Sequence, residues 1–598
     1  MKDTFDFLLV KSVVRKALLW YLLLVFILPF LFVVGRSIVN QFQEPTIWGK
    51  GPSKDGSFIC EYGGFRSIYH EDYCSVDEWI HDIGATYLLF YVFFIGFVLG
   101  EIIPSDLLTL LIPTLFTYSV IFLVIYIKKR KRKNVLKHIH FIGICGVAMS
   151  ALAIALHKKG YKVTGSDKGF YPPISTHLKN VGIPYYAGWH PEKMIEHGVP
   201  DLVVVGNVAG SSNPEWQYIE KQNIPYKSYP EVVKEFFVKE KSIVCAGTYG
   251  KSTSTTLLSW LFKSSGMEPS YMVGVLPLNE MDAAEIGDGE WSILEGDEYK
   301  ASRWDTKAKF FHYAPTHLLL TSVVWDHADV YPTEASYRDA FQSLVHMLPH
   351  DGLLVLSEQA QSQIDTSGVR AKIVTYGKKD GNEYQYTNIT QSKDGISFDI
   401  LHDGKSYHMT SPLLGEYMAD NITGCFALAH SIGIPEKHIL SALHSFSGMK
   451  RRLEKRATSP VTVFDDIAHS PTKARSTLAT LRSVYTGRIF AVFEPNTGNR
   501  QKEAIPAYAD AFRDADTVII PRLTKIKVDP SDPDEALDGD TLTAVIGKTH
   551  SNVRYISDDE QLVTFLVQES KPGDVIVFLG SHGFRNMIER VTDQLKQK

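Results

Sequence analysis

Cysteine is scarce in this chain, and its scarcity excludes one class of fold. The 598 residues contain five cysteines, too few and too scattered for the disulfide framework of a small secreted domain. Cys145, Cys245 and Cys425 lie in apolar strand or helix patterns, which predicts small buried residues. Cys60 and Cys74 lie in a polar segment, where a single disulfide is possible if that segment is exported.

An excess of charge of either sign is also lacking. The chain has 62 basic and 67 acidic residues and a formal net charge of −5. A balance of this kind gives no electrostatic reason to expect a nucleic acid partner. The length, in contrast, predicts several domains at the usual ~100–200 residues per domain.

Long apolar runs are present, and they gather at the N-terminus. Residues 17–35 form nineteen consecutive uncharged positions, long enough to span a bilayer. Two further apolar runs cover residues 84–100 and 107–127, and the last ends at six consecutive basic residues, 128–133. We therefore expect residues 1–133 to be a membrane segment with two or three apolar helices.

The charges around these runs give two answers about orientation. Basic residues before the first run favour a cytoplasmic N-terminus, so three full spans would leave residues 134–598 outside. The basic block at 128–133 instead favours a cytoplasmic C-terminal part. Two net crossings, or an N-terminus outside, reconcile these signals and place the catalytic domains in the cytoplasm at the inner membrane. A cleavable signal peptide is a further alternative, although no small-residue cleavage site follows the first run.

From His138 onward, apolar strand patterns alternate with helical patterns. This alternation indicates an α/β protein with parallel sheets. We expect three such domains, at residues 138–238, 239–448 and 449–598.

The most informative motif follows the apolar run at residues 243–246. Residues 247–253 read Gly-Thr-Tyr-Gly-Lys-Ser-Thr and lead into a helical pattern. Such a strand–turn–helix binds phosphate through backbone N–H groups, while Lys251 supplies a positive charge and Ser252 can ligate Mg²⁺. The glycines are closer together than in the full Walker pattern, and a glycine turn that merely caps a helix is the alternative.

A second glycine turn lies in the first expected domain. Gly143 and Gly146 follow a strand, and the next strand ends at Ser166 and Asp167, where an acid could reach a sugar hydroxyl. Asn207 ends a further strand at the same edge. Because two glycines of the dinucleotide fingerprint are replaced, a purely structural turn is equally compatible with this pattern.

Acidic residues end two strands of the central domain. Glu295, Asp297 and Glu298 follow one apolar strand, and Asp326 and His327 follow another. Mg²⁺ prefers one or two carboxylates together with phosphate oxygens and water. Each acid alone could be a solvated helix cap, but their joint position beside a phosphate loop favours a magnesium site.

The third domain begins with a basic triplet that includes Arg451 and Arg452. A strand then ends at Asp465 and Asp466, and His469 follows. A basic triplet is most often a solvated surface, but next to a nucleotide site it can bind phosphate.

Together these motifs resemble the Mur ligase family, the ATP-dependent enzymes that add amino acids or peptides to UDP-N-acetylmuramate. The family pattern Gly-Thr-x-Gly-Lys-[Ser/Thr]-[Ser/Thr] matches residues 247–253, and further family motifs match 295–298, 326–327, 450–454 and 465–471 in order. The resemblance covers everything after the membrane segment. It implies three domains: a Rossmann-like UDP-binding domain, a P-loop ATPase-like central domain and a Rossmann-like C-terminal domain.

The resemblance also implies roles for individual residues. Those expected to bind ATP are Gly247, Thr248, Gly250, Lys251, Ser252, Thr253, Asn421 and Asp466. Those expected in catalysis are Lys251, Glu295, His327, Arg451, Arg452 and His469. The expected magnesium ligands are Ser252, Glu295 and His327. The residues expected to bind the UDP substrate are Gly143, Gly146, Ser166, Asp167 and Asn207.

Within the family, Gly143-Ile144-Cys145-Gly146 and the 326–329 sequence Asp-His-Ala-Asp are similar to one branch. That branch attaches the murein peptide L-Ala-γ-D-Glu-meso-diaminopimelate to UDP-N-acetylmuramate, using ATP and Mg²⁺ and passing through an acyl phosphate. One alternative is the ligation of L-alanine to the same acceptor. Others are a ligase acting on another polymer, as in the folate and cyanophycin branches, and a membrane-bound scaffold that binds UDP-muramate without catalysis.

One family motif is altered. Where the family has Gly-x-His-Asn-x-x-Asn, residues 415–421 read Gly-Glu-Tyr-Met-Ala-Asp-Asn. The resemblance places the missing His-Asn pair near the adenine, so the change bears on ATP affinity or base preference. Tyr417 could stack on a base instead.

Overall fold

The computed structural model describes residues 57–62, 65–70, 138–170, 174–327, 330–524 and 536–598. The chain divides into two units, Met1–Val135 and Leu136–Lys598. In the first unit, the described residues form an antiparallel pair of strands, β1 (Ser57–Tyr62) and β2 (Phe65–His70).

The predicted membrane segment falls largely outside this description. All three apolar runs and Cys74 lie outside the described residues. Within the described ranges, no helix is both long enough and apolar enough to cross a bilayer.

The second unit begins with a five-stranded sheet in the order β5-β4-β3-β6-β7, and all of its strand pairs are parallel. Its strands are β3 (His138–Ile142), β4 (Lys162–Asp167), β5 (Tyr185–Ala187), β6 (Leu202–Val205) and β7 (Tyr226–Ser228). Its helices are α5 (Val147–Lys158), α6 (Ile174–Val181), α7 (Pro191–Met194), α8 (Pro214–Lys221) and α9 (Tyr229–Phe236). The strand β3 is buried along its whole length, including its two histidines, His138 and His140.

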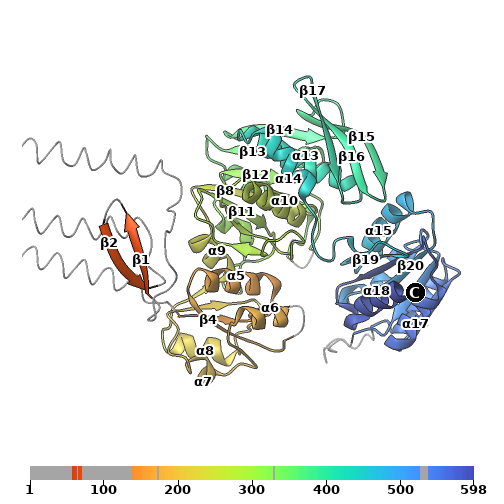
Figure 1. Ribbon diagram of the computed structural model, residues 1–598, viewed down its shortest axis with the longest axis horizontal. Helices are drawn as coiled ribbons and strands as arrows, with labels where there is room; N and C mark the ends of the chain where they lie inside the picture. The colour runs from red at the N-terminus through yellow and green to blue at the C-terminus, as the bar shows by residue number, and fades with distance from the viewer. Residues whose placement is uncertain (1–56, 63–64, 71–137, 171–173, 328–329, 525–535) are drawn as a thin grey trace, which may run out of the picture. The chain divides into compact units, whose positions relative to one another are not determined.

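The central sheet has ten strands in the order β10-β9-β11-β8-β12-β13-β14-β15-β16-β17. They are β8 (Lys241–Ala246), β9 (Ser270–Met272), β10 (Ala284–Glu285), β11 (Trp291–Gly296), β12 (His317–Leu320), β13 (Leu353–Ser357), β14 (Lys372–Gly377), β15 (Tyr384–Ser392), β16 (Gly395–His402) and β17 (Lys405–Ser411). Its helices are α10 (Lys251–Ser264), η2 (Lys309–His312), α11 (Glu334–His346), α12 (Glu358–Gln361), α13 (Glu416–Ser431) and α14 (Glu436–Ser445). The helix α10 packs against α13 and α14 (Figure 1).

The third sheet has six strands in the order β18-β19-β23-β20-β21-β22. They are β18 (Glu454–Ala457), β19 (Thr462–Asp466), β20 (Ile489–Glu494), β21 (Thr517–Pro521), β22 (Val553–Ile556) and β23 (Val575–Gly580). The accompanying helices are α15 (Pro471–Val484), η3 (Thr497–Arg500), η4 (Lys502–Tyr508), α16 (Gly539–Gly547), α17 (Asp559–Glu569), η5 (Phe584–Asn586) and α18 (Met587–Gln597). Separate apolar cores lie on its two faces.

Three α/β segments with mainly parallel sheets are therefore confirmed. The departures are antiparallel: β10 pairs with β9, β16 and β17 extend the central sheet, and β18 pairs with β19. Along β16 and β17, buried residues recur at every second position, because one face of these strands packs inward and the other faces solvent.

The register of the central strands positions the site. Ala246, at the end of β8, lies opposite Gly296 in β11 and Leu320 in β12. Three strands thus end at one edge of the sheet, and the segments that follow them converge there. In open α/β sheets, ligands bind outside the carboxyl ends of the strands.

Candidate active site

The phosphate loop runs from the end of β8 to the start of α10 at Lys251. Gly247 and Gly250 have φ values of 135° and 83°, a conformation that favours glycine. A Cβ atom at Gly247 would overlap Thr321, and one at Gly250 would overlap the Asn421 side chain. The loop is therefore fixed by two other segments of the chain, and Asn421 of α13 lies against it as the ATP prediction requires.

The loop is further held by its polar contacts to the segment after β12. The Thr248 amide donates to the Ser322 carbonyl at 3.0 Å, and the Thr248 hydroxyl donates to the Val324 carbonyl at 2.7 Å. The first turn of α10 follows directly and presents Ser252 and Thr253. The N-terminus of this helix thus offers N–H groups to an anion.

Each acid at the end of β11 or directly after it contacts a different partner. Glu295 accepts a hydrogen bond from the Ser252 hydroxyl at 2.6 Å. Asp297 pairs with Lys309 at 2.5 Å; burial opposes its ionisation, but the lysine outweighs it and lowers the Asp297 pKa. Glu298 pairs with the phosphate-loop lysine, and three adjacent carboxylates therefore serve three separate purposes.

Glu298 is the acid that the sequence reasoning left out of the site. It is almost fully buried, and its carboxylate lies 2.9 Å from the Lys251 ammonium and 3.2 Å from Nε2 of His327. Lys251 also donates to the Gly247 carbonyl at 2.7 Å. Because an uncompensated buried charge is costly, Glu298 holds the cation at the head of the loop. The signal was present in the acidic cluster 295–298, but the sequence did not say which acid faces the lysine.

The sequence predicts that His327 binds magnesium together with Ser252 and Glu295, but its ring contacts Tyr299 and Glu298. Its Nδ1 shares a 2.8 Å hydrogen bond with the Tyr299 hydroxyl, while Nε2 faces Glu298. The hydrogen bond to Glu298 raises the His327 pKa, against the effect of burial. Both ring nitrogens are thus occupied by protein groups and not directed at the Ser252–Glu295 pair.

The Ser252–Glu295 pair fits Mg²⁺. A hydroxyl and a carboxylate oxygen at the mouth of a phosphate loop are the hard donors that Mg²⁺ takes when phosphate and water supply the rest. The second Glu295 oxygen accepts from the Gly274 amide at 2.6 Å, which fixes the orientation of the carboxylate. In the described part of the chain there is no group of three His, Cys, Asp or Glu residues suited to a metal.

The third domain contributes Asp466 and His469. Asp466, at the end of β19, is buried and accepts hydrogen bonds from the amides of Leu453 and Ala468, at 2.7 and 2.8 Å. Burial raises its pKa and these two amides oppose that effect. His469 donates from Nδ1 to the Ile467 carbonyl at 2.7 Å, and burial lowers its pKa, which keeps the ring neutral with Nε2 as an acceptor.

The two predicted arginines differ sharply in their surroundings. The Arg451 guanidinium donates to the carbonyls of Gly580, Ser581 and His582 and contacts Asp465. These contacts connect the segment before β18 to β19 and to the end of β23, and they occupy the guanidinium N–H groups that a phosphate would need. The Arg452 side chain is exposed, so of the two it is the one placed to reach an anion.

Lys473 is a second residue that the sequence reasoning missed. It lies exposed in the first turn of α15, where a cation is disfavoured by the helix dipole. Desolvation, Arg452 and Lys251 lower its pKa, while Asp326 and Asp466 raise it. Cations of the central and third domains therefore share one neighbourhood, as a polyanionic ligand requires. A lysine at an unfavourable helix position was the available signal.

The first domain uses its predicted residues mainly to shape its own glycine turn. Gly143 has a φ of 92°, and its amide donates to the Ser166 carbonyl at 2.8 Å. The Asp167 carboxylate accepts from the amide of Cys145 at 2.8 Å, so it caps the turn that begins α5 after Gly146. Cys145 is half-buried and not buried as expected, whereas Cys245 and Cys425 are buried.

Asn207 links the first domain to the central one. Its side-chain amide donates to the Lys300 carbonyl at 3.4 Å, and its own carbonyl accepts from Arg303. Trp304, from the same central-domain segment, packs against Trp216 of the first domain with ring centroids 5.3 Å apart. The segment after the acidic cluster therefore reaches the mouth of the first domain.

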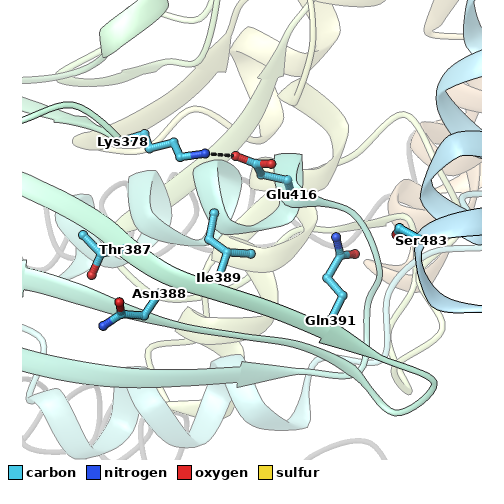
Figure 2. Close-up of a pocket in the computed structure, with 7 residues that line it drawn as sticks. All are labelled: Lys378, Thr387, Asn388, Ile389, Gln391, Glu416 and Ser483. Carbon is cyan, nitrogen blue, oxygen red and sulfur yellow. Dashed lines mark hydrogen bonds and ion pairs between the residues drawn. The ribbon is translucent and has the colours of Figure 1, made fainter.

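A polar pocket of about 400 Å³ lies apart from these residues. It is lined by Lys378, Thr387, Asn388, Ile389, Gln391, Glu416 and Ser483 (Figure 2). An ion pair of 2.6 Å between Lys378 and Glu416 crosses it, and none of the predicted site residues lines it. We place the chemistry at the phosphate loop because the charged groups converge there.

Asp420, next to Asn421 on α13, makes the stability of the site region depend on pH. Burial raises its pKa to about 7, and Glu358 adds to the shift. Between about pH 4 and 7 the unfolded chain loses a proton that the folded chain keeps, so the free energy of unfolding falls as pH rises through this window. Asp420→Asn should therefore stabilise the protein by roughly 2–4 kcal/mol at pH 8 and by little at pH 4. Urea unfolding of the wild type and the variant at both pH values measures this difference in the free energy of unfolding. An equal increase in stability at pH 4 and pH 8 would contradict the prediction.

Comparison with known proteins agrees with this geometry. Three family models match the chain: Mur ligase family, catalytic domain, over residues 138–240; Mur ligase middle domain, over 245–429; and Mur ligase, glutamate ligase domain, over 451–582.

Individual relatives are similar over the same region. The UDP-N-acetylmuramate–L-alanyl-γ-D-glutamyl-meso-2,6-diaminoheptandioate ligase of Haemophilus influenzae is 30% identical over 77% of this chain and 100% of its own length. The UDP-N-acetylmuramate–L-alanine ligase of Mesorhizobium japonicum is 28% identical over 74% of this chain and 94% of its own. The crystal structure of a murein peptide ligase from Psychrobacter arcticus is 26% identical, with a TM-score of 0.57, and covers 77% of this chain and 99% of its own. This chain belongs to the Mur ligase family of ATP-dependent, ADP-forming ligases.

Proposed function

We propose that this protein joins the carboxylate of UDP-N-acetylmuramate to the amine of a murein peptide, L-Ala-γ-D-Glu-meso-diaminopimelate, with hydrolysis of ATP to ADP. The observation that carries the proposal is the network that the buried Glu298 forms with Lys251 and His327 at the start of α10. The choice of peptide is supported by the similarity to the Haemophilus ligase over that enzyme's whole length.

The reaction has two steps, and the residues divide between them. In the first, an oxygen of the muramyl carboxylate attacks the γ-phosphorus of ATP, and ADP leaves with the electrons of the broken P–O bond. Lys251 and the N-terminus of α10 hold the phosphates, and Ser252 and Glu295 are the groups that would hold Mg²⁺. The metal supplies charge neutralisation at the phosphate oxygens. Such phosphoryl transfer depends mainly on positioning and electrostatics.

In the second step, the amine of the peptide attacks the acyl phosphate carbonyl. The tetrahedral intermediate collapses to the amide, phosphate leaves, and the amine gives up a proton. His469, kept neutral by burial, has a free Nε2 that can take part in proton transfer. Arg452 and Lys473, from the third domain, are placed to neutralise the anionic intermediate. Water must be excluded from the acyl phosphate, which closure of the third domain provides.

Phosphate release tests the proposal. The full-length protein with ATP, Mg²⁺ and UDP-N-acetylmuramate should release phosphate with the tripeptide at a kcat/KM at least about tenfold above that with L-alanine, which corresponds to roughly 1.4 kcal/mol of transition-state binding. A preference for L-alanine would favour the alternative, which the similarity to L-alanine ligases supports. No release with either substrate, in a preparation that binds UDP-N-acetylmuramate, would favour the scaffold.

We also propose that residues 1–133 attach the ligase to the inner membrane with its catalytic domains in the cytoplasm. The support is the uncharged run 17–35 and the basic block 128–133. Cell fractionation checks this: the full chain should sediment with membranes after a high-salt wash, and a variant that lacks residues 1–133 should not. Equal solubility of the two would contradict the proposal.

A further inference from the structure

Tyr417 lies one helical turn from Asn421, the residue of α13 that contacts the phosphate loop. It is in the first turn of α13, four residues before Asn421, and residues i and i+4 share one face of a helix. Asn421 on that face is the residue against which Gly250 packs. A nucleotide whose phosphates lie on the loop therefore has its sugar and base within reach of Tyr417.

The ring of Tyr417 is held in place by a glycine. Gly415 has a φ of 106°, and a Cβ atom there would overlap the tyrosine ring. One side of the ring therefore lies against bare backbone, which only glycine permits. Even so, 47% of the residue is exposed, so a large part of the ring is available to a ligand.

The electrostatic surroundings of the Tyr417 hydroxyl include charged groups of the third domain. Desolvation raises the pKa of its hydroxyl although the residue is exposed, because protein atoms crowd around that end of the ring. The charges that act on the hydroxyl are Asp466 and Arg452, both from the third domain. Asp466, the carboxylate that is expected to bind the ribose, is therefore among the charged groups near Tyr417.

The residue after Tyr417 contributes little to base recognition. Met418 is 3% exposed and packs into the apolar core. A buried thioether cannot hydrogen-bond the edge of a purine as an amide would. Stacking, in contrast, is tolerant of base identity because every base has a π-face.

We propose that Tyr417 is the stacking platform for the nucleotide base, and that this site binds nucleoside triphosphates with little preference for adenine. The inference rests on the proposed function and deepens it. Guanine, cytosine and uracil nucleotides should bind within about tenfold of ATP.

Calorimetry with non-hydrolysable analogues of ATP, GTP and CTP tests this on the full-length protein, without the other substrates. Tyr417→Ala should raise Kd for all three by a similar factor, roughly 5- to 150-fold from ~1–3 kcal/mol per stacked base. Tyr417→Phe should retain wild-type affinity, because the ring and not the hydroxyl makes the contact. Leu401→Ala, which truncates an exposed apolar residue on β16, is the control for surface truncation.

A second variant gives a spectroscopic signal, so the test does not rely on the alanine variant being folded. In Tyr417→Trp, added indole fluorescence should be quenched by each analogue, because a stacked base quenches the ring it covers. Three results would overturn the inference: an ATP preference above about 100-fold, an unchanged Kd in Tyr417→Ala, or no quenching in Tyr417→Trp. If the wild-type protein still bound ATP, the proposed function would be unaffected. If the wild-type protein bound no nucleotide, this inference and the proposed function would both be wrong.

Discussion

Lys251→Ala is expected to lower kcat by about 10³-fold while the protein stays folded. The Lys251 ammonium lies between the Gly247 carbonyl and the Glu298 carboxylate, and its side chain is 14% exposed. It is thus a pre-organised cation in a largely dry site, and loss of one such group typically costs 10²–10³ in rate. The measurement is phosphate release at saturating substrates, with the melting temperature recorded alongside.

A matched control lies on the same helix. Lys263 also belongs to α10 and pairs with Glu285, but that ion pair is partly exposed to solvent. Lys263→Ala should leave kcat within about twofold, because exposed pairs contribute little. If Lys251→Ala kept activity within tenfold of wild type, the loop would not be the phosphate site.

Glu298→Gln is expected to lower kcat by about 10²-fold and to shift its pH dependence. The amide matches the carboxylate in shape but removes the charge that Lys251 and His327 face. Since the hydrogen bond to Glu298 raises the His327 pKa, the ring in the variant should lose its proton at lower pH. The kcat–pH profile should show the His327 limb displaced toward acid.

The stability of this variant follows the same reasoning. In the wild type, a raised histidine pKa stabilises the fold below the ordinary pKa, and that gain is lost as pH rises through the folded value. Glu298→Gln should remove this pH dependence and destabilise the protein by about 3 kcal/mol, as when one partner leaves a buried ion pair. Glu285→Gln, at the partly exposed pair, should alter neither quantity. An unchanged pH profile in Glu298→Gln would show that His327 does not depend on Glu298.

The sequence predicted the parts of the site that depend on local geometry. A strand that runs into a glycine turn and a helix can be read directly, so Lys251, Ser252 and the end of β8 lie where the pattern indicated. Acids at the ends of parallel strands also converge, because β11 and β8 run in register. These predictions needed only neighbouring residues and the direction of the strands.

The missed features depend on side-chain direction across long distances. Whether Glu295 or Glu298 meets Lys251 depends on how the segment after β11 turns away from the sheet. Arg451 and Arg452 are adjacent, yet Arg451 has a φ of 58° and turns its side chain into its own domain. Sequence periodicity and motifs do not encode the direction of these side chains. Only the folded structure shows that Arg451 points into its own domain and that Arg452 is exposed.

The phosphate loop also determines how late in synthesis the chain acquires its nucleotide site. The first domain has its last strand at Ser228 and its last helix, α9, at Phe236, so it can fold once α9 has left the ribosome. The loop itself is translated soon afterwards, but Thr321 and Asn421, which close in on Gly247 and Gly250, are translated much later. A nascent chain that ends before α13 carries the motif without its geometry. The growing polypeptide can therefore bind ATP only after the whole central sheet has been synthesised.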